Sequence, residues 1–584
     1  MSTTYLGKAR LFGLLLALSG LGFQAYAQSL TGRIDGRVRD ESGGGVPDAH
    51  ITTVHQGTNR AHEARTSATG RFSIPNARLG LYRIEAEAED FQRVVVADIL
   101  VEVGGVATVS LELPVGIASF SVTVEAKQAQ SSINLVDSEI GEVVDNRQIL
   151  ELPLNGRNAV ELALQQAGVY YERTNQGQGN KFFVHGQRHR AVNFTLDGID
   201  TQDNLNRASS TLIDLPLLPM AAENVQEFRV VTGLSSAEFS RGAAQITAVT
   251  RSGSNDLHGS VFHFHRNTVL NANDFFNNTT DVERPPLIRN QFGGRLGGPI
   301  VKNRTFFYFG YQQTREARSI AVNRTVYTPE ARAGLFRYLD GVRNTPENVA
   351  ANPGLVRSVN LMDCGPEATV SLSRDCVDGR FNGARPASID PFIENNVFGL
   401  VPPPNNFDLG DGLNTGGFRF NSPSRTTEHL PSFRLDHRLN DVHSFAGTIN
   451  YADRNIQGDF NNGREPRYPG QIPLGSRVTH SKAFSGSLTS TFSPTFLNEF
   501  RFGFLGAENT FLVTQPFPTP YTLNLNTITD PYDSNDGDEV RDNKVFHLRD
   551  SFSWARGRHQ FKAGGEWRQR TVDTYSFDLV NPFG

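Results

Sequence analysis

The 584-residue chain contains few of the residues on which many protein classes depend: 2 cysteines, 3 methionines and 2 tryptophans. The 56 basic and 61 acidic side chains leave a net charge of −5, which gives no electrostatic case for a nucleic-acid partner. After residue 27 no apolar run approaches the length of a membrane-spanning helix. These shortages exclude a helical membrane protein and argue against a nucleic-acid-binding protein.

The motifs of several enzyme classes are also missing. The chain has no H-E-x-x-H or H-x-x-E zinc motif, no G-x-S-x-G nucleophile elbow and no Walker loop, so we predict neither an enzyme nor a cofactor. Asp197, Asp200 and Asp203 do not have EF-hand spacing and are better explained as turn and capping carboxylates. His263 and His265 share a strand face, where polar residues facing a lumen explain them better than a metal site.

The two cysteines, Cys364 and Cys376, lie in a segment rich in Pro, Asn and Gly. In an oxidising compartment we expect them to form a disulfide that staples a loop. A metal pair is the alternative, but no nearby histidine completes a four-ligand set.

The N-terminus has the pattern of a secretory signal peptide over residues 1–27. Lys8 and Arg10 precede an apolar run from Leu11 to Phe23, and Ala25-Tyr26-Ala27 is an A-x-A cleavage site. The alternative is an uncleaved anchor, for which the run is short. A secreted membrane protein without spanning helices can cross the bilayer only as a closed β-barrel.

Residues 432–451 predict an amphipathic β-hairpin. Phe433, Leu435 and Leu439 share one parity and Arg434, Asp436 and Arg438 the other, with a turn at Asn440-Asp441-Val442. Since successive strand residues point to opposite faces, each strand has one apolar and one polar face. The pattern recurs to the end of the chain, and many of its 41 phenylalanines lie on the apolar parity, as in transmembrane barrels.

The predicted connections alternate between tight turns and long loops. Asn440, Ser493 and Ala555 lie in tight turns, and the long connections are Ala317–Ser424, Asp453–Arg477 and Gly506–Val540. Short turns at one end and long loops at the other are typical of outer-membrane barrels. A soluble sandwich, the alternative, has no reason to separate loop lengths in this way.

The sequence divides into four parts after the signal peptide. Residues 28–115 predict a small β-sandwich and resemble the carboxypeptidase regulatory-like, transthyretin-like domain. Residues 116–130 read as a linker, with the last strand of the sandwich as the alternative for its extended piece. Residues 131–255 predict a mixed α+β unit, and residues 256–584 predict strands of a partial transmembrane antiparallel β-barrel. The fold class is therefore mainly β.

The middle of the chain resembles the TonB-dependent outer-membrane receptors of the Oar-like branch. The resemblance rests on ordered motifs: Leu152–Asn158, His185–Arg188, Asn193–Asp200, Val225–Val230, Ala237–Gly242, Val249–Ser260, Asn290–Gly294 and Gly297–Ile300. It implies a plug inserted in a barrel of about 22 strands. The sequence shows about nine barrel strands, too few to enclose a plug. We therefore expect a C-terminally truncated receptor.

The resemblance also implies that TonB, the periplasmic protein that transmits proton-motive force, is a partner. TonB captures an extended segment by β-strand addition. The candidate TonB box is the extended segment before the plug: Ser121, Val122, Thr123, Val124, Glu125 and Ala126.

The plug motifs supply the remaining candidate site residues. Asn155-Gly156 and Asp197-Gly198 are tight-turn dipeptides with a mainly structural reading. Arg157, Arg229 and Arg241 are expected to pair with carboxylates of the barrel wall, with ligand contact as the alternative. The full set of candidates is Asn155, Gly156, Arg157, Asn158, Asp197, Gly198, Glu227, Arg229, Glu238 and Arg241.

Three functions compete at this point. The first is import of an unidentified solute by a TonB-dependent receptor in the outer membrane, with the N-terminal domain in the periplasm. The second is surface adhesion or carbohydrate binding without transport. The third is a soluble secreted adhesin. The expected partners are TonB, outer-membrane lipid and an extracellular ligand.

Overall fold

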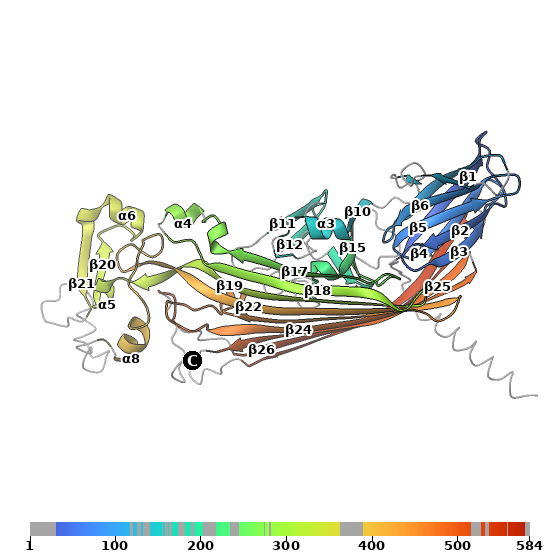
Figure 1. Cartoon of the computed structure of the whole chain (residues 1–584). Helices are drawn as coiled ribbons and strands as arrows, with labels where there is room; N and C mark the ends of the chain where they lie inside the picture. The colour runs from blue at the N-terminus through green and yellow to red at the C-terminus, as the bar shows by residue number, and fades with distance from the viewer. Residues whose placement is uncertain are drawn as a thin grey trace, which may run out of the picture.

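The computed structural model shows a long curved sheet, a small β-sandwich at one end of it and a mixed domain on its inner face (Figure 1). Among the described residues, no helix combines the length and the apolar character needed to cross a membrane. The structure describes residues 31–116, 121–124, 130–131, 140–152, 154, 156–157, 162, 166–172, 181–187, 192–202, 218–233, 244–273, 275–279, 282–361, 389, 391–493, 495–514, 527–531, 537–556 and 559–577.

The N-terminal sandwich packs two sheets, ordered β4-β1-β7-β9 and β3-β2-β5-β6-β8, around one apolar core. Its strands alternate: Tyr82, Ile84 and Ala86 of one strand are buried, whereas the residues between them are more exposed. The predicted β-sandwich is therefore correct. Its strands are β1 (Gly32–Asp40), β2 (His50–His55), β3 (Arg60–Arg65), β4 (Arg71–Ala77), β5 (Gly80–Glu87), β6 (Arg93–Val101), β7 (Val106–Leu113), β8 (Ser121–Val124) and β9 (Gln130–Ser131).

The mixed domain, which we call the plug, is built on a five-stranded sheet ordered β10-β15-β16-β13-β14. The predicted helix near Asn146 is present, and Asp145 and Gln148 form a capping box at its start. The elements are β10 (Ile140–Asp145), α3 (Asn146–Glu151), β11 (Val169–Glu172), β12 (Lys181–Val184), β13 (Val192–Leu196), β14 (Ile199–Asp200), η3 (Ala222–Asn224), β15 (Val225–Gly233) and β16 (Ala244–Thr250).

The long sheet is antiparallel and has nine strands in the order β17-β18-β19-β22-β23-β24-β25-β26-β27, with β17 and β27 at its edges. The barrel is thus open within the described residues, and the strand count agrees with the sequence estimate. The strands are β17 (His258–Asn267), β18 (Leu287–Val301), β19 (Thr305–Tyr327), β22 (Thr415–Arg438), β23 (His443–Gln457), β24 (Gly475–Ser493), β25 (Phe496–Val513), β26 (Glu539–Arg556) and β27 (His559–Ser576).

The hairpin of β22 and β23 has the predicted turn, because Asn440 Oδ1 accepts hydrogen bonds from the backbone N–H groups of Val442 and His443. Its polar face is the buried one: Asp436 is 1% exposed. Its apolar face is open, with Phe433 39% exposed. The apolar parity therefore forms the outer face of the sheet, and the polar parity forms the inner face that carries the plug.

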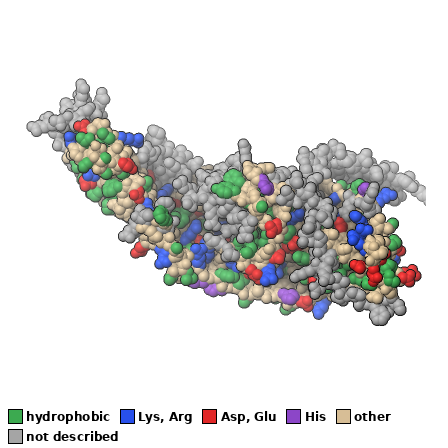
Figure 2. All heavy atoms as spheres, turned by 90° about the horizontal axis from the view of Figure 1, so that it is seen from above, with side chains coloured by type: hydrophobic (Ala, Val, Ile, Leu, Met, Phe, Trp, Pro, Cys, Tyr) green, Lys and Arg blue, Asp and Glu red, His purple; other side chains and the backbone are tan. Residues whose placement is uncertain are grey.

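Among the described side chains, the face on the plug side is not uniformly apolar (Figure 2). Figure 2 shows the molecule from above, and the described hydrophobic side chains there lie in small groups among charged ones. The exposed large apolar residues of the late strands belong to the outer face: Phe433, Ile449, Phe484, Phe500, Phe546, Leu548, Phe552, Trp554, Phe561 and Trp567.

The predicted long loops are shorter than expected, since the strands continue beyond the apolar pattern. β19 runs on to Tyr327 and β22 begins at Thr415, so both ends of Ala317–Ser424 are strand. The same correction applies to the other two long connections, which the extended ends of β23 to β26 shorten. Backbone pairing thus continues beyond the segments in which apolar residues alternate.

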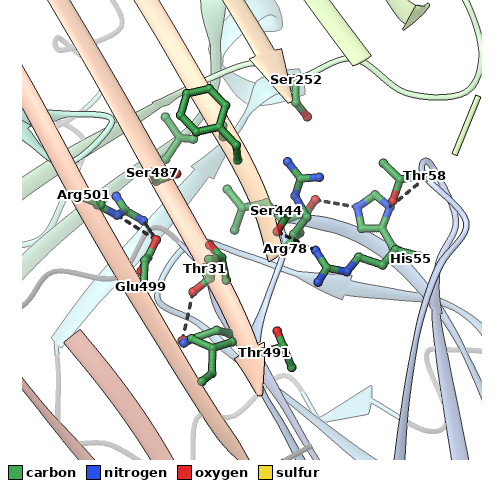
Figure 3. A pocket seen from close by; sticks show the side chains of 18 of the residues that line it. Thr31, His55, Thr58, Arg78, Ser252, Ser444, Ser487, Thr491, Glu499 and Arg501 are labelled. Atoms are coloured by element: carbon green, nitrogen blue, oxygen red, sulfur yellow. Dashed lines mark hydrogen bonds and ion pairs between the residues drawn. The ribbon is translucent and has the colours of Figure 1, made fainter. Parts of the chain in front are cut away.

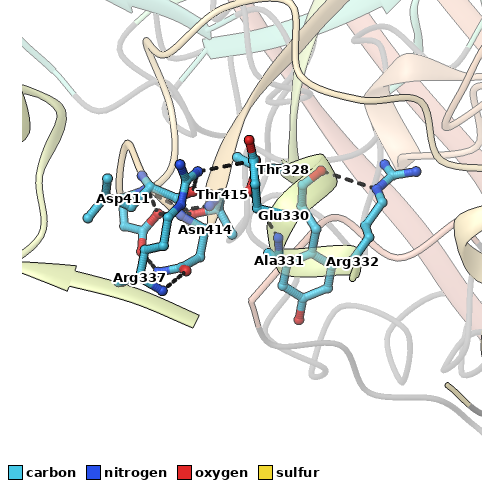
Figure 4. Close-up of polar contacts among 10 residues, drawn as sticks. Thr328, Glu330, Ala331, Arg332, Arg337, Asp411, Asn414 and Thr415 are labelled. Carbon is cyan, nitrogen blue, oxygen red and sulfur yellow. Dashed lines mark hydrogen bonds and ion pairs between the residues drawn. The ribbon is translucent and has the colours of Figure 1, made fainter. Parts of the chain in front are cut away.

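The described residues of the β19–β22 connection, 328–361, 389 and 391–414, form a cap at the end of the sheet opposite the sandwich (Figure 1). Asp411 organises part of it by accepting the backbone N–H groups of Leu413, Asn414 and Thr415 at 3.1, 2.7 and 2.8 Å (Figure 4). Burial alone raises the pKa of Asp411, but these hydrogen bonds outweigh it and lower the pKa to about 2. The cap contains α5 (Pro329–Arg332), β20 (Leu335–Leu339), α6 (Pro346–Ala351), β21 (Val356–Asn360) and α8 (Pro391–Ile393).

The prediction that His263 and His265 face the lumen is wrong. The plug residue Arg157 stacks on the ring of Phe264, which marks the inner face of β17. The two histidines alternate with Phe264 and so lie on the outer face, where both contact Asn290 Oδ1, at 3.2 and 2.9 Å.

Candidate functional site

The candidate site is the seat of the plug, the set of contacts that fixes the plug and the sandwich on the inner face of the sheet. Small apolar residues of the wall, among them Ala452, Ala483 and Ala507, join the plug core. Gly503 allows a close approach, because a Cβ there would lie 2.3 Å from a carbon of Ile199. The remaining contacts of the seat are mostly charged.

Asp436 of β22 is the first charged centre of the seat. Its carboxylate accepts two hydrogen bonds from Arg434, at 2.9 and 3.1 Å, and also pairs with Arg78 of the sandwich. Arg434 donates onward to the carbonyl of Thr250 in the plug at 2.6 Å. One buried carboxylate thus holds cations that link the wall to both of the other domains.

The turn between β13 and β14 forms the second centre. Asp197 has a φ of 49° and Gly198 one of 82°, as the tight-turn prediction requires. Asp197 accepts the backbone N–H and the hydroxyl of Thr250 at 2.8 and 2.6 Å. Asp200 is fully buried and pairs with Arg568, at 2.8 Å, and with Arg570 on β27.

Glu223 forms the third centre and corrects an expectation. Arg157 pairs with Glu223 at 2.8 Å, so its carboxylate partner belongs to the plug and not to the barrel wall. The wall contributes instead the ring of Phe264, 4.0 Å from the guanidinium carbon, and Arg295, 3.5 Å from Glu223. Gly156 lies beside this centre and its carbonyl accepts a hydrogen bond from Gln291 at 2.9 Å.

Glu227 and Arg229 of β15 face the sandwich. Glu227 accepts the backbone N–H of Val103 at 2.7 Å. Burial, together with the neighbouring acids Glu102 and Asp145, raises the pKa of Glu227 to about 8. A Cβ added to Gly104 would collide with Nη1 of Arg229, which places this guanidinium against the sandwich and not against the barrel wall.

The candidate TonB box lies partly within the described residues. Ser121–Val124 form β8, which pairs in parallel with β6 from Arg93 to Val96 as an outer strand of the sandwich sheet. This arrangement matches the alternative interpretation of the linker.

Several predicted features lie outside the described residues. They are the signal peptide, Asn155, Asn158, Asp203, Glu238, Arg241, the box residues Glu125 and Ala126, and the cysteines Cys364 and Cys376.

Sequence reasoning missed most of the charged centres, although a signal for them exists. Opposite charges two residues apart on the polar parity of a strand must share a face. This spacing occurs in ion pairs of the inner face: Arg434 with Asp436, Glu499 with Arg501, Glu539 with Arg541, and Glu566 with Arg568.

Three family models match this chain in the order of its parts. They are the carboxypeptidase regulatory-like domain over residues 33–114, the TonB-dependent receptor plug domain over residues 139–246, and the outer membrane beta barrel domain over residues 249–581.

Among known proteins, the TonB-dependent transporter Oar of Myxococcus xanthus is 27% identical over 318 residues. That match covers 52% of this chain and 29% of the relative, so the chain spans under a third of the relative's length. Two similar solved structures are the outer membrane transporter YddB from Escherichia coli (11% identity, TM-score 0.45) and the siderophore receptor PirA from Acinetobacter baumannii (12% identity, TM-score 0.42). Each is matched over 74% of this chain and 48% of its own length.

Proposed function

Because this chain belongs to the TonB-dependent receptor family of outer-membrane β-barrel proteins, we propose that it takes part in energised uptake of a solute through its barrel. The plug blocks the path at rest, and TonB opens it by pulling on Ser121–Val124 from the periplasm. The seat of the plug is the observation that carries this proposal. Buried charges fix the plug to the wall, and such contacts weaken when water enters.

The topology of the plug supports a partial opening. Within the described residues, β10 is an edge strand whose one partner is β15, over the register from Ile140–Gly233 to Asp145–Glu227. It is also the first strand of the plug sheet in chain order after the candidate box. A pull on the chain before the plug acts first on the N-terminal end of β10. The charged centres at Asp200 and Glu223 lie on other segments of the plug. Peeling β10 therefore opens the plug without unseating the rest.

Deletion of Ser121–Val124 tests the coupling in the full protein in its own cell. We expect energised uptake to be abolished and surface binding of the solute to persist. Val122→Pro with Val124→Pro should reproduce the loss, since proline removes the N–H groups that strand addition needs. The matched pair Val122→Thr with Val124→Thr should retain uptake. Loss of surface binding in the deletion would argue against the assignment.

A cross-link tests the opening step separately. Val143 and Arg229 are directly opposed in the β10–β15 ladder, at a separation that suits a disulfide. The double cysteine variant should bind solute but import none when oxidised, and should regain import on reduction. Import by the oxidised form would exclude peeling of β10. Surface adhesion without transport is favoured only if the unaltered protein binds the solute and imports none of it.

A further inference from the structure

A polar cavity of about 90 Å³ lies where the sandwich, the plug and the wall meet (Figure 3). Its volume holds several water molecules, and therefore one tetrahedral oxyanion. Hydroxyl groups line it from all sides, including Thr31 and Thr58 of the sandwich, Ser252 beside the plug, and Ser444 and Ser487 of the wall. The cavity adjoins the first charged centre of the seat, since Arg78 and Arg434 line it, and it does not include the coupling segment Ser121–Val124.

The charge around the cavity is unbalanced. Four guanidiniums line it, those of Arg60, Arg78, Arg434 and Arg501, together with one carboxylate, that of Glu499. Asp436 is shared by Arg78 and Arg434, and Glu499 holds Arg501. Arg60 contacts the hydroxyl of Ser444 at 2.9 Å, and no ion pair of Arg60 occurs among the described residues. The cavity therefore carries an excess of two positive charges.

Two polar groups in the lining lack partners. Arg501 is 7% exposed, and its Nη1 has no hydrogen-bond partner within the described parts of the chain. The same holds for the buried hydroxyl oxygen of Thr491. Nη1 of Arg501 lies beside Gly198 of the plug, 2.7 Å from where a Cβ on that glycine would be. The hydroxyl of Thr491 is therefore the group that indicates a hydrogen-bonding ligand, because buried polar groups normally have partners.

The buried position and the arginines of the cavity also lower the pKa values of its two histidines. Burial and the cations Arg60 and Arg438 lower the pKa of His62 to about 4, and burial lowers the pKa of His55. Burial and the repulsion of Arg78 lower the pKa of Arg60 to about 10. Both histidines are neutral at pH 7, so the arginines supply the positive charge of the cavity.

We propose that this cavity binds an oxyanion, a phosphate or carboxylate group, that bridges the sandwich to the wall. Guanidinium forks and hydroxyls are the groups that bind such anions in proteins. Arg60 and Arg78 approach from the sandwich, whereas Arg434 and Arg501 approach from the wall, so the anion neutralises cations of two domains at once. Binding therefore stabilises the docked sandwich by linkage. This site does not depend on transport.

Isothermal titration calorimetry of the full detergent-solubilised protein tests the proposal, with inorganic phosphate as the probe and chloride at the same ionic strength as the control. Phosphate should bind saturably and chloride should not. Malonate is a second probe, which distinguishes a carboxylate source from a phosphate source. Binding of either oxyanion supports the site, and absence of saturable binding by both overturns it.

Two variants on one strand locate the binding. Arg60→Gln should weaken phosphate binding by roughly tenfold or more, since it removes the uncompensated cation. Arg65→Gln, an exposed arginine at the other end of β3, should leave the affinity unchanged. Thr491→Val removes the unpartnered hydroxyl, disturbs the fold little and should also weaken binding. Equal affinity in all three variants would place the anion elsewhere and overturn the proposal.

Discussion

The sandwich and the nine-stranded sheet use the same two-residue alternation in opposite senses. In β5 of the sandwich the apolar residues Tyr82 and Ile84 are buried. In β25 of the sheet the charged residues Glu499 and Arg501 are buried, and Phe500 between them is 38% exposed. Alternation therefore fixes which residues share a face, but the surroundings decide which face is covered. The sandwich packs on itself, whereas the sheet has lipid on one side and the plug on the other.

The largest effect is expected in the charged layer of the sheet. Asp436→Ala leaves Arg78 and Arg434 without their shared carboxylate, at a cost of about 3–5 kcal/mol. Asp441→Ala, which removes the exposed partner of Arg438 in the adjacent turn, should cost less than about 1 kcal/mol. The urea concentration at which the plug and the sandwich become protease-sensitive measures the difference. Equal midpoints would mean that buried charge does not hold the seat.

Two exposed leucines test whether the outer face of the sheet is covered by lipid while the surface of the sandwich is covered by water. Leu548 on the outer face of β26 is 44% exposed and Leu81 of the sandwich is 41% exposed. Leu548→Arg should cost about 2–4 kcal/mol of membrane stability, because it places a charge in the apolar band. Residue 81 faces water, so Leu81→Arg should change the stability by no more than about 0.5 kcal/mol. Folding yield in lipid vesicles distinguishes them, and similar yields would contradict a lipid-facing outer face.

The cap should respond independently of both regions. Asp411→Ala removes the acceptor for three backbone N–H groups and should destabilise the cap by about 1–3 kcal/mol. Asp408→Ala, which removes an exposed partner of Arg419, is the matched control with an expected cost below about 1 kcal/mol. Proteolysis should begin in the cap of the first variant alone, while the sheet remains protected.

The smallest effect concerns pH and the docking of the sandwich on the plug. The pKa of Glu227, about 8 when docked, lies above its ordinary value of 4.5, so the docked state retains a proton that the separated state releases. Docking should therefore weaken as the pH rises from about 4.5 to about 8, and change little above that. Glu227→Gln keeps an acceptor for Val103 and should remove this dependence. The yield of a cross-link between the sandwich and the plug measures docking at each pH. The same pH dependence in Glu227→Gln would show that Glu227 is not the group responsible.

The sequence predicted the architecture well because alternation and turn chemistry are local. Phe433 and Asp436 were assigned to opposite faces, and the turn at Asn440 was found, without any long-range information. The predicted loops were too long, because β19 continues to Tyr327 after the lipid-dependent pattern ends.

The site was less predictable, because its contacts join distant segments. Arg157 was expected to meet a carboxylate of the wall, yet its partner Glu223 lies 66 residues away within the plug itself. The pairing of Arg78 with Asp436 spans 358 residues, and no local pattern encodes it. The pairing of β8 with β6 was not predictable for a similar reason. An extended linker and an outer strand of the sandwich have the same local sequence pattern.

Spin-label accessibility along β26 tests the central claim most directly. Single cysteines at positions 545 to 552, in a background with Cys364 and Cys376 replaced by serine, report contact with oxygen, which partitions into lipid, and with a water-soluble nickel reagent. We predict a two-residue period in reconstituted vesicles: high oxygen contact at Phe546, Leu548 and Phe552, and low contact for both reagents at Val545, His547 and Ser551, which face the plug. Uniform access of the nickel reagent at every position would show that no lipid covers the outer face.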